Sequence, residues 1–342
     1  MSYLLFTEDF PPGFTGGVSS WAHDLALALA KDGVHVFARK TKDVRAYDSQ
    51  FPVEITRMPG RNWGKYKSTW TWLAARKATA KVAIFAHWQL ASRAARGLKK
   101  KGVEIWVFVH GSDILPQSIN QKQLKRTADL IDIWLPVSRS LETRLHKLIG
   151  KVNSTVPPMP IQIPNNPSPP TPGGPLLVIS RLVFSKGIDN AINWAEMLNR
   201  TLHIIGDGPD RERLEKHSKS KNVVFLGQLS RNECLRHIEK SSSVLLLSKA
   251  HKNQIGDEGL GLCLLEAASQ ARGCIGSHSG GIPEAIGRGI LIPDVPDRSH
   301  IETIKNKLDD SQWGLECYNW VKAHHGAERC AAFLNRLRHD RP

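Results

Sequence analysis

Residues 3–38 read YLLFTEDFPPGFTGGVSSWAHDLALALAKDGVHVFA and predict a strand, a loop, a helix and a second strand. The apolar run YLLF suits a buried strand, and Gly33 stands where a helix stop is expected. The apolar positions that share one face of the helix are Val18, Trp21, Ala22, Leu25 and Leu29. The order strand, helix, strand predicts one βαβ unit.

The same alternation continues through the first half of the chain. Three further apolar runs, each short enough for a strand buried on both faces, are VAIFAH (82–87), VEIWVFVHG (103–111) and IDIWLPVS (131–138). Between them lie stretches long enough for helices. The first half is therefore expected to be an α/β domain with a parallel sheet.

A proline-rich stretch, VPPMPIQIPNNPSPPTPGGP (156–175), follows and is unsuited to a helix or a central strand. The alternation then restarts. Strands are expected at LLVIS (176–180), LHIIG (202–206), NVVFLG (222–227) and VLLLS (244–248), and helices at 188–198, 211–219, 232–240 and 262–271. A second doubly wound α/β domain is therefore predicted.

These patterns divide the chain into a first Rossmann-like domain at 1–165, a second at 166–310, and helices at 311–342 that cross back to the first domain. A chain of 342 residues exceeds what one hydrophobic core usually organises. Parallel sheets bind ligands beyond the carboxyl ends of their strands. We expect the two sheets to face a common cleft that holds the site.

Composition is that of a globular protein, with 41% hydrophobic and 23% charged residues. No run of about 18 apolar residues occurs, and MSYLLFTEDF lacks the features of a secretory signal. We expect a cytoplasmic protein, in one version peripheral on the inner face of the cytoplasmic membrane. The cysteines, whose spacing gives neither CxxC nor a zinc pattern and predicts neither a disulfide nor a metal, are Cys234, Cys263, Cys274, Cys317 and Cys330.

The net charge of +15 lies mostly in the first half. Residues 1–165 hold 24 Lys and Arg against 12 Asp and Glu, and residues 55–103 hold 12 basic residues, no acidic one and several aromatic ones. Nucleic acid, an anionic membrane or an acidic acceptor could supply the opposite charge. The alternative is a solvated basic face with its aromatic residues in the core.

Two weak patterns suit a phosphorylated ligand. Gly16 and Gly17 precede the first helix, where backbone amides can approach an anion, although a plain glycine turn fits equally well. In ISRLVFSKGID, Arg181 follows a strand and Lys186 stands at the start of the next helix. Two cations there suit a diphosphate, and the alternative is ordinary surface charge.

The most specific pattern is EGLGLCLLEAA, in which Glu258 and Glu266 stand eight positions apart. If the segment were helical throughout, the carboxylates would lie about 12 Å apart along its axis, which compares with the span from a sugar to the ribose of its nucleotide. A helix start near Leu262 would offer unpaired amides to the diphosphate between them. The alternative is a helix with acidic residues near its first turn.

Eight segments, in this order, resemble a family 4 glycosyltransferase with the GT-B fold. They are TGGVSSWAHDLALALAKDGVHV, FVHGSD, LPVSRSLETRL, ISRLVFSKGID, LHIIGDGPDRERLE, VVFLGQLSRNE, EGLGLCLLEA and GGIPEAI. The similarity covers nearly the whole chain. It implies two Rossmann-like domains and transfer of a hexose from a nucleotide diphosphate sugar with retention of configuration and without a metal or other cofactor.

The resemblance also implies a role for particular residues. Glu258 looks like the residue that holds hydroxyl groups of the donor sugar, and Glu266 like the one that binds the ribose. Arg181 and Lys186 look like the clamp on the diphosphate, and His110 is similar to the histidine beside the reacting carbon; its alternative is a satisfied histidine at a strand end. The remaining residues assigned to the nucleotide sugar are Gly16, Gly17, Gly259, Leu260, Gly261 and Leu262.

Some positions depart from the family pattern. Cys263 stands where Pro is common and Leu260 where Phe is common, which leaves the donor open. The acceptor is expected to be an anionic glycan or lipid-linked molecule, reached through residues 57–101, and nucleic acid is not expected as a partner. The rival functions are a nucleotide-sugar epimerase of the same fold and a basic nucleic-acid-binding protein, which would make no use of Glu258 or Lys186.

Overall fold

The computed structural model describes residues 1–14, 16–76, 78–115, 120–170, 173–218, 222–249, 258–293, 298–308 and 310–340. The chain divides into two compact units. The first unit comprises Met1–Ile161 and His325–Pro342, and the second comprises Gln162–His324.

The first unit contains a six-stranded parallel sheet in the order β3-β2-β1-β4-β5-β6. At its centre the ring of Phe6 stacks on Phe37 at 4.7 Å and on Phe85 at 4.8 Å. Every residue of β1 and β4 is buried, so these continuous apolar runs are strands covered on both faces. The strands are β1 (Tyr3–Thr7), β2 (Val34–Arg39), β3 (Glu54–Met58), β4 (Val82–Phe85), β5 (Glu104–Val109) and β6 (Ile133–Pro136).

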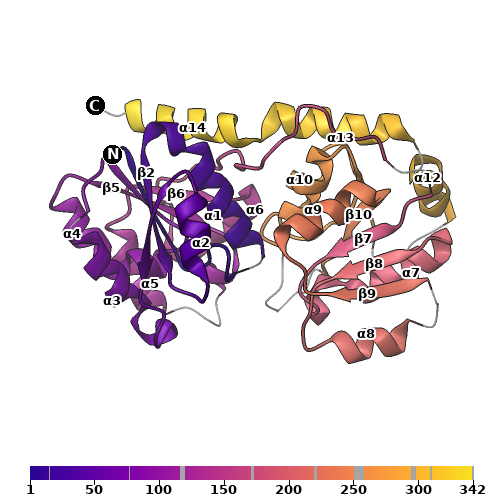
Figure 1. The fold of residues 1–342 in the computed structure, drawn as a ribbon, viewed down its shortest axis with the longest axis horizontal. Helices are drawn as coiled ribbons and strands as arrows, with labels where there is room; N and C mark the ends of the chain where they lie inside the picture. Colours follow the sequence, from indigo (N-terminus) through magenta and orange to yellow (C-terminus); the bar gives the residue numbers. More distant parts are fainter. Residues whose placement is uncertain are drawn as a thin grey trace. The chain divides into compact units, whose positions relative to one another are not determined.

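Helices cover both faces of the first sheet (Figure 1), with α1 and α2 on one side and α3 and α4 on the other. The last helix, α14, packs on α1, and the Tyr3 hydroxyl donates to Oδ1 of Asn335 at 2.8 Å. The final segment is thus an integral part of the first unit. Its helices are α1 (Gly17–Ala28), α2 (Val44–Gln50), α3 (Trp63–Ala75), α4 (Trp88–Lys99), α5 (Gln121–Ala128), α6 (Arg139–Ile149) and α14 (Ala327–His339).

The second unit repeats this topology, with a parallel sheet in the order β12-β11-β10-β7-β8-β9. Its strands are β7 (Leu176–Ile179), β8 (Leu202–Ile205), β9 (Val223–Gly227), β10 (Ser243–Leu246), β11 (Gly273–Ser277) and β12 (Ile290–Ile292). Its helices are α7 (Ile188–Leu198), α8 (Arg211–His217), α9 (Arg231–Lys240), α10 (Leu262–Ser269), α11 (Ile282–Ala285), α12 (Arg298–Leu308) and α13 (Ser311–His324). The predicted class, two doubly wound parallel sheets, is confirmed.

The end of the chain is divided between the units, whereas the sequence led us to expect 311–342 as one returning segment. Helix α13 lies in the second unit, where the Trp313 ring fills the space beside Gly273: a Cβ at Gly273 would come within 2.2 Å of that ring. Helix α14 lies in the first unit. The split falls beside Gly326, which adopts φ 110°.

Both sheets reverse their strand order at one point, between β1 and β4 in the first unit and between β7 and β10 in the second. Connections leave in opposite directions on the two sides of such a point, which opens a crevice at the carboxyl ends of the strands. Each unit therefore has one topologically favoured place for a ligand.

Candidate functional site

The second unit places a lysine and a glutamate in contact at its reversal point. Lys186 ends a 3-10 turn after β7, and its Nζ lies 2.5 Å from Oε2 of Glu258. Ser248, just beyond β10, donates its hydroxyl to the same oxygen at 3.4 Å. The side chains of Lys186 and Glu258 are 24% and 16% exposed, so a ligand in solvent can reach both charges.

Close backbone packing fixes the Glu258 loop. The carbonyl of Glu258 accepts the N–H of Gly281 at 2.8 Å. Gly280 adopts φ 53°, and a Cβ there would lie 2.1 Å from that carbonyl oxygen. The first position of GGIPEAI therefore requires glycine, since any side chain there would push Glu258 away from Lys186.

Glu258 precedes helix α10, which begins at Leu262, so the helical spacing of about 12 Å between the two glutamates does not apply. Gly261 adopts φ 100° as the N-cap, and Gly259, Leu260 and Gly261 are buried. Glu266 lies on the helix with Oε1 3.6 Å from a guanidinium nitrogen of Arg231. Arg231, from α9, is a neighbour that the motif did not reveal.

Arg181 follows β7 but stays apart from this ion pair. Its side chain is exposed, and among the described residues no hydrogen bond or ion pair involves its guanidinium. The loop that carries Arg181 packs closely on Gly206, where a Cβ would lie 1.9 Å from the carbonyl oxygen of Ser180. The structure thus brings Lys186 to Glu258 and leaves Arg181 available to an anion.

In the first unit, Gly16 and Gly17 begin helix α1. Gly16 is its N-cap at φ 117°, a conformation that glycine adopts readily. A Cβ at either glycine would meet no described atom within 4 Å. Gly16 and Gly17 therefore leave space at the start of the helix, and no described atom prevents a ligand from approaching it.

His110 follows β5 and is held in a nonpolar environment. Its ring lies 4.5 Å from that of Trp21 in an edge arrangement, and its backbone N–H donates to Asp113 at 3.1 Å. Burial, together with the nearby His87, lowers the pKa of His110 to about 3, so the imidazole is neutral near pH 7. Nε2 is shielded from solvent and has no hydrogen-bond partner among the described residues.

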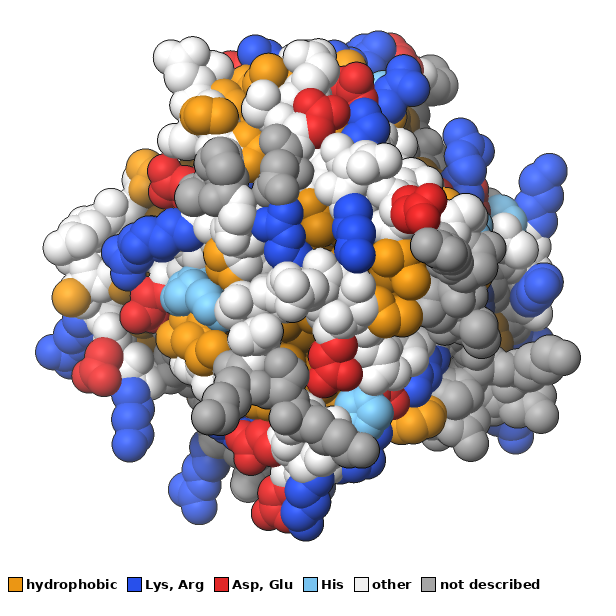
Figure 2. Space-filling view, turned by 90° about the vertical axis from the view of Figure 1, so that its right-hand side faces the viewer, with side chains coloured by type: hydrophobic (Ala, Val, Ile, Leu, Met, Phe, Trp, Pro, Cys, Tyr) orange, Lys and Arg blue, Asp and Glu red, His pale blue; other side chains and the backbone are white. Residues whose placement is uncertain are grey.

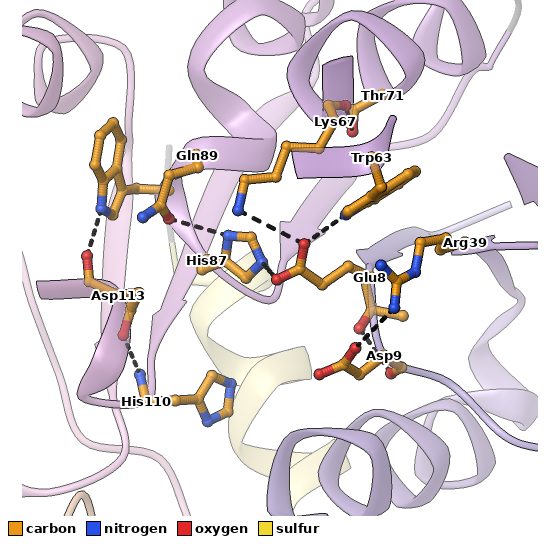
Figure 3. Close-up of polar contacts among 12 residues, drawn as sticks. Glu8, Asp9, Arg39, Trp63, Lys67, Thr71, His87, Gln89, His110 and Asp113 are labelled. Atoms are coloured by element: carbon orange, nitrogen blue, oxygen red, sulfur yellow. Dashed lines mark hydrogen bonds and ion pairs between the residues drawn. The ribbon is translucent and has the colours of Figure 1, made fainter. Parts of the chain in front are cut away.

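Glu8 and His87, just beyond β1 and β4, lie together with Trp63 and Lys67 of helix α3 (Figure 3). These four side chains, which we call the Glu8 cluster, were not singled out as site residues from the sequence. Oε1 of Glu8 lies 3.0 Å from Nε2 of His87. Oε2 accepts the indole N–H of Trp63 at 2.5 Å and lies 3.6 Å from Nζ of Lys67. Glu8 and His87 are 79 positions apart, so no local motif could have joined them.

The charge state of Glu8 follows from these contacts. Burial alone would raise its pKa, but the contacts with His87, the charge of Lys67 and the Trp63 hydrogen bond together lower the pKa to about 2. The neighbouring Asp9 behaves in the opposite way, because burial and the charge of Glu8 raise its pKa. Glu8 is therefore a carboxylate at neutral pH.

The basic segment 57–101 is divided between internal and exposed roles. Arg57 is 7% exposed in its side chain and pairs with Asp48 at 2.6 Å, and Lys101 donates to the carbonyl of Arg76 at 2.6 Å. Trp63 and Trp88 are buried. Part of the segment thus stabilises the domain itself, as the alternative interpretation held.

Helix α3 nevertheless presents one apolar and basic face, which we call the α3 face. Tyr66, Trp72 and Leu73 are 38%, 38% and 41% exposed. Nζ of Lys65 lies 5.4 Å from the centre of the Tyr66 ring, and the Arg76 guanidinium lies 5.2 Å from that of Trp72. By contrast, the face of the molecule drawn in Figure 2 carries basic and acidic side chains interspersed.

Within the described residues, no three His, Cys, Asp or Glu side chains gather as a metal-ligand set. None of the helices in the described part of the chain combines the length and the apolar content needed to cross a bilayer.

Two family models match the chain, and the boundary between them lies close to the boundary between the two units. Residues 15–163 match the model "Glycosyltransferase Family 4", and residues 164–312 match "Glycosyl transferases group 1". The chain is 24% identical over 341 residues to a GDP-mannose-dependent monoacylated alpha-(1-6)-phosphatidylinositol monomannoside mannosyltransferase of Corynebacterium glutamicum, covering 90% of this chain and 88% of that one. A GDP-mannose-dependent alpha-(1-6)-phosphatidylinositol monomannoside mannosyltransferase of Mycobacterium tuberculosis is 25% identical, with coverage of 83% and 82%.

Solved structures agree on the fold. HepE of Anabaena, in complex with UDP and glucose, superposes with a TM-score of 0.77 at 15% identity, covering 98% of this chain and 99% of that one. Sucrose-phosphate synthase of Thermosynechococcus elongatus superposes with a TM-score of 0.75 at 18% identity, covering 99% and 98%. The arrangement of two six-stranded parallel sheets is therefore shared with structures of the GT-B class.

Proposed function

Because the chain belongs to the family 4 glycosyltransferases with the GT-B fold, we propose that it transfers a hexose from a nucleotide diphosphate sugar to a hydroxyl group of a glycolipid or acidic glycan. The observation that carries this proposal is the contact between Lys186 and Glu258 at the reversal point of the second sheet. The cation suits the diphosphate of the donor, and the carboxylate beside it suits the hydroxyl groups of the donor sugar.

In this reaction Lys186 neutralises the diphosphate, whose negative charge increases as the bond to the sugar breaks. Arg181, exposed and without a described partner, supplies the second positive charge. Glu258 accepts hydrogen bonds from hydroxyl groups of the sugar. The N–H groups at the start of α10, after Gly261, add donors for phosphate oxygens.

No strong protein nucleophile is required. The leaving phosphate takes the proton of the acceptor hydroxyl while the positive groups stabilise it, and the sugar keeps its anomeric configuration. Neutral His110 suits a hydrogen bond to the reacting sugar better than a proton transfer at neutral pH. The proposed reaction uses no metal ion and no cofactor beyond the donor itself.

The relatives suggest GDP-mannose as the first donor to test and a phosphatidylinositol mannoside as the first acceptor. A membrane-held acceptor would also account for the α3 face, since exposed Trp and Leu beside Lys and Arg suit the surface of an anionic bilayer. We place the protein, on this proposal, at the inner face of the cytoplasmic membrane.

A donor panel tests the proposal. Purified protein is incubated with GDP-mannose, UDP-glucose, UDP-galactose and UDP-N-acetylglucosamine, with and without phosphatidylinositol monomannoside, and nucleoside diphosphate release is measured. Acceptor-dependent release from one donor, abolished in Glu258→Ala with the fold intact, is expected. Conversion of a nucleotide sugar into its epimer without acceptor would instead identify the rival epimerase, and an absence of binding to every nucleotide would reject both.

A further inference from the structure

The two units share a strand order, so the reversal point of the first sheet corresponds to the one that holds the candidate site in the second. In the second unit, Lys186 follows β7 and Ser248 follows β10. The corresponding strands of the first unit are β1 and β4, and the residues just beyond them are Glu8 and His87. An acidic and a basic side chain in contact, Lys186 with Glu258 and His87 with Glu8, therefore lie at the favoured ligand position of each sheet.

The Glu8 carboxylate is held from three sides (Figure 3): the Trp63 indole and Lys67 approach one oxygen, and His87 approaches the other. His87 is itself fixed, because its Nδ1 lies 3.0 Å from Oε1 of Gln89. The Glu8 side chain remains 25% exposed. It is therefore rigid, charged and still reachable by a ligand.

We propose that Glu8 binds the acceptor by accepting hydrogen bonds from hydroxyl groups of its sugar or polyol part, with Lys67, Trp63 and His87 holding the carboxylate in place. This inference rests on the proposed function, which requires an acceptor site but does not say which residues form it.

The ligand class follows from the chemistry of the cluster. An ionised carboxylate offers about four lone-pair sites and no donor, so it pairs with hydroxyl groups and repels phosphate. Of its basic neighbours, Lys67 is positively charged and His87 is positively charged when protonated. Both already face the Glu8 carboxylate and offset its charge. A neutral polyol surface therefore suits the cluster better than the phosphate of a lipid headgroup.

A role for Glu8 as a general base fits the cluster less well. With a pKa of about 2 the carboxylate is a weak base at neutral pH. The same value keeps it ionised, which favours short, charge-assisted hydrogen bonds to hydroxyl groups. Glu8 is thus a recognition residue, and the three residues around it are positioning residues.

Binding of two small polyols, methyl α-D-mannopyranoside and myo-inositol, to the full-length protein provides the test by saturation-transfer NMR. We expect wild type to bind at least one of them and Glu8→Gln to bind about tenfold more weakly, the loss typical of one charge-assisted hydrogen bond. Glu54→Gln, which changes an exposed carboxylate on β3 of the same unit, is the matched control and should bind like wild type.

Lys67→Met keeps the carboxylate but frees one side of it. We expect it to raise the acceptor KM less than Glu8→Gln does, with the donor KM unchanged in both variants, a split that a general loss of structure would not produce. Equal polyol binding in wild type and Glu8→Gln, or binding of neither polyol by wild type, would overturn the inference.

Nucleotide binding separates the two proposals. Thermal shifts with GDP and UDP report on the second unit, and Glu8→Gln should shift as wild type does. If wild type binds no nucleotide, the proposed function fails whatever the polyol result. If nucleotide binds and is turned over but Glu8→Gln has an unchanged acceptor KM, the inference alone fails.

Discussion

Lys186 and Glu258 stand 72 positions apart in the chain, yet Nζ of one lies 2.5 Å from a carboxylate oxygen of the other. The contact means that Lys186 is already oriented by Glu258 before a diphosphate arrives, so little side-chain freedom is lost on binding. The same contact means that replacing either residue removes this ion pair from the other.

Lys186→Met should therefore lower kcat by about 100-fold to 1,000-fold, the usual effect of removing one group that stabilises charge in the transition state. It should also abolish the thermal shift with nucleoside diphosphates. Lys216→Met, an exposed lysine on α8 of the same unit, is the control and should behave as wild type. A Lys186→Met protein that keeps full turnover would remove this residue from the mechanism.

Arg272→Leu should destabilise the second unit. Arg272 is fully buried, and its guanidinium donates to the carbonyls of Ile238, Ser168, Ala271 and Glu239. Leucine removes the four hydrogen bonds that the guanidinium donates, at an expected cost of about 3–5 kcal/mol.

Urea unfolding followed by circular dichroism measures this effect. Arg236→Leu, on the exposed side of α9, should change the midpoint little. An Arg272→Leu midpoint equal to that of wild type would mean that water or rearranged backbone replaces the guanidinium.

His110 should make the stability of the first unit depend on pH. The folded pKa of about 3 lies below the ordinary value of 6.5, so between these values the unfolded chain binds the proton that the folded chain does not. Stability is then fully present above pH 6.5 and is lost as pH falls, by about 2 kcal/mol at pH 5.

His110→Phe removes this dependence, and its free energy of unfolding should fall less than that of wild type between pH 7 and pH 5. His339→Phe, at the exposed end of α14, should keep the wild-type slope. Identical slopes for wild type and His110→Phe would show that the imidazole is protonated inside the folded unit.

The α3 face should attach the protein to anionic lipid. Trp72→Ala combined with Leu73→Ala removes exposed apolar area and one partner of Arg76, so cosedimentation with phosphatidylglycerol vesicles should fall several-fold. Phosphatidylcholine vesicles should bind wild type weakly, and added salt should weaken binding to the anionic ones.

Leu315→Ala, at a leucine 40% exposed on α13, is the matched apolar control and should bind vesicles as wild type does. Retention of full binding by the double variant would show that a surface other than the α3 face binds the vesicles.

Sequence periodicity predicted those elements whose burial pattern is strong. The helix expected at 188–198 is α7 without a shift, because its apolar face is continuous and glycine precedes it. The pattern gave no signal for β11, whose sequence GCIGS is rich in small residues, or for β12, which has three residues. Edge strand β3, with alternating exposure, was also missed.

The candidate site was predictable where a motif is local and hidden where it is assembled by the fold. Glu258 was identified from its spacing to Glu266, and Lys186 from its place after a strand. Glu8 and His87 offered no such cue, since each follows a different strand and only the sheet order makes them neighbours. Arg231 was hidden for the same reason, because it reaches Glu266 from a separate helix.

Helix α14 contributes to the first unit although it is the last helix of the chain. During synthesis the ribosome must therefore release the whole second unit before the surface of α1 receives its cover. The first unit is therefore completed only after residues 162–324 have been synthesised, and a chain that stops before Ala327 lacks the helix that packs on α1.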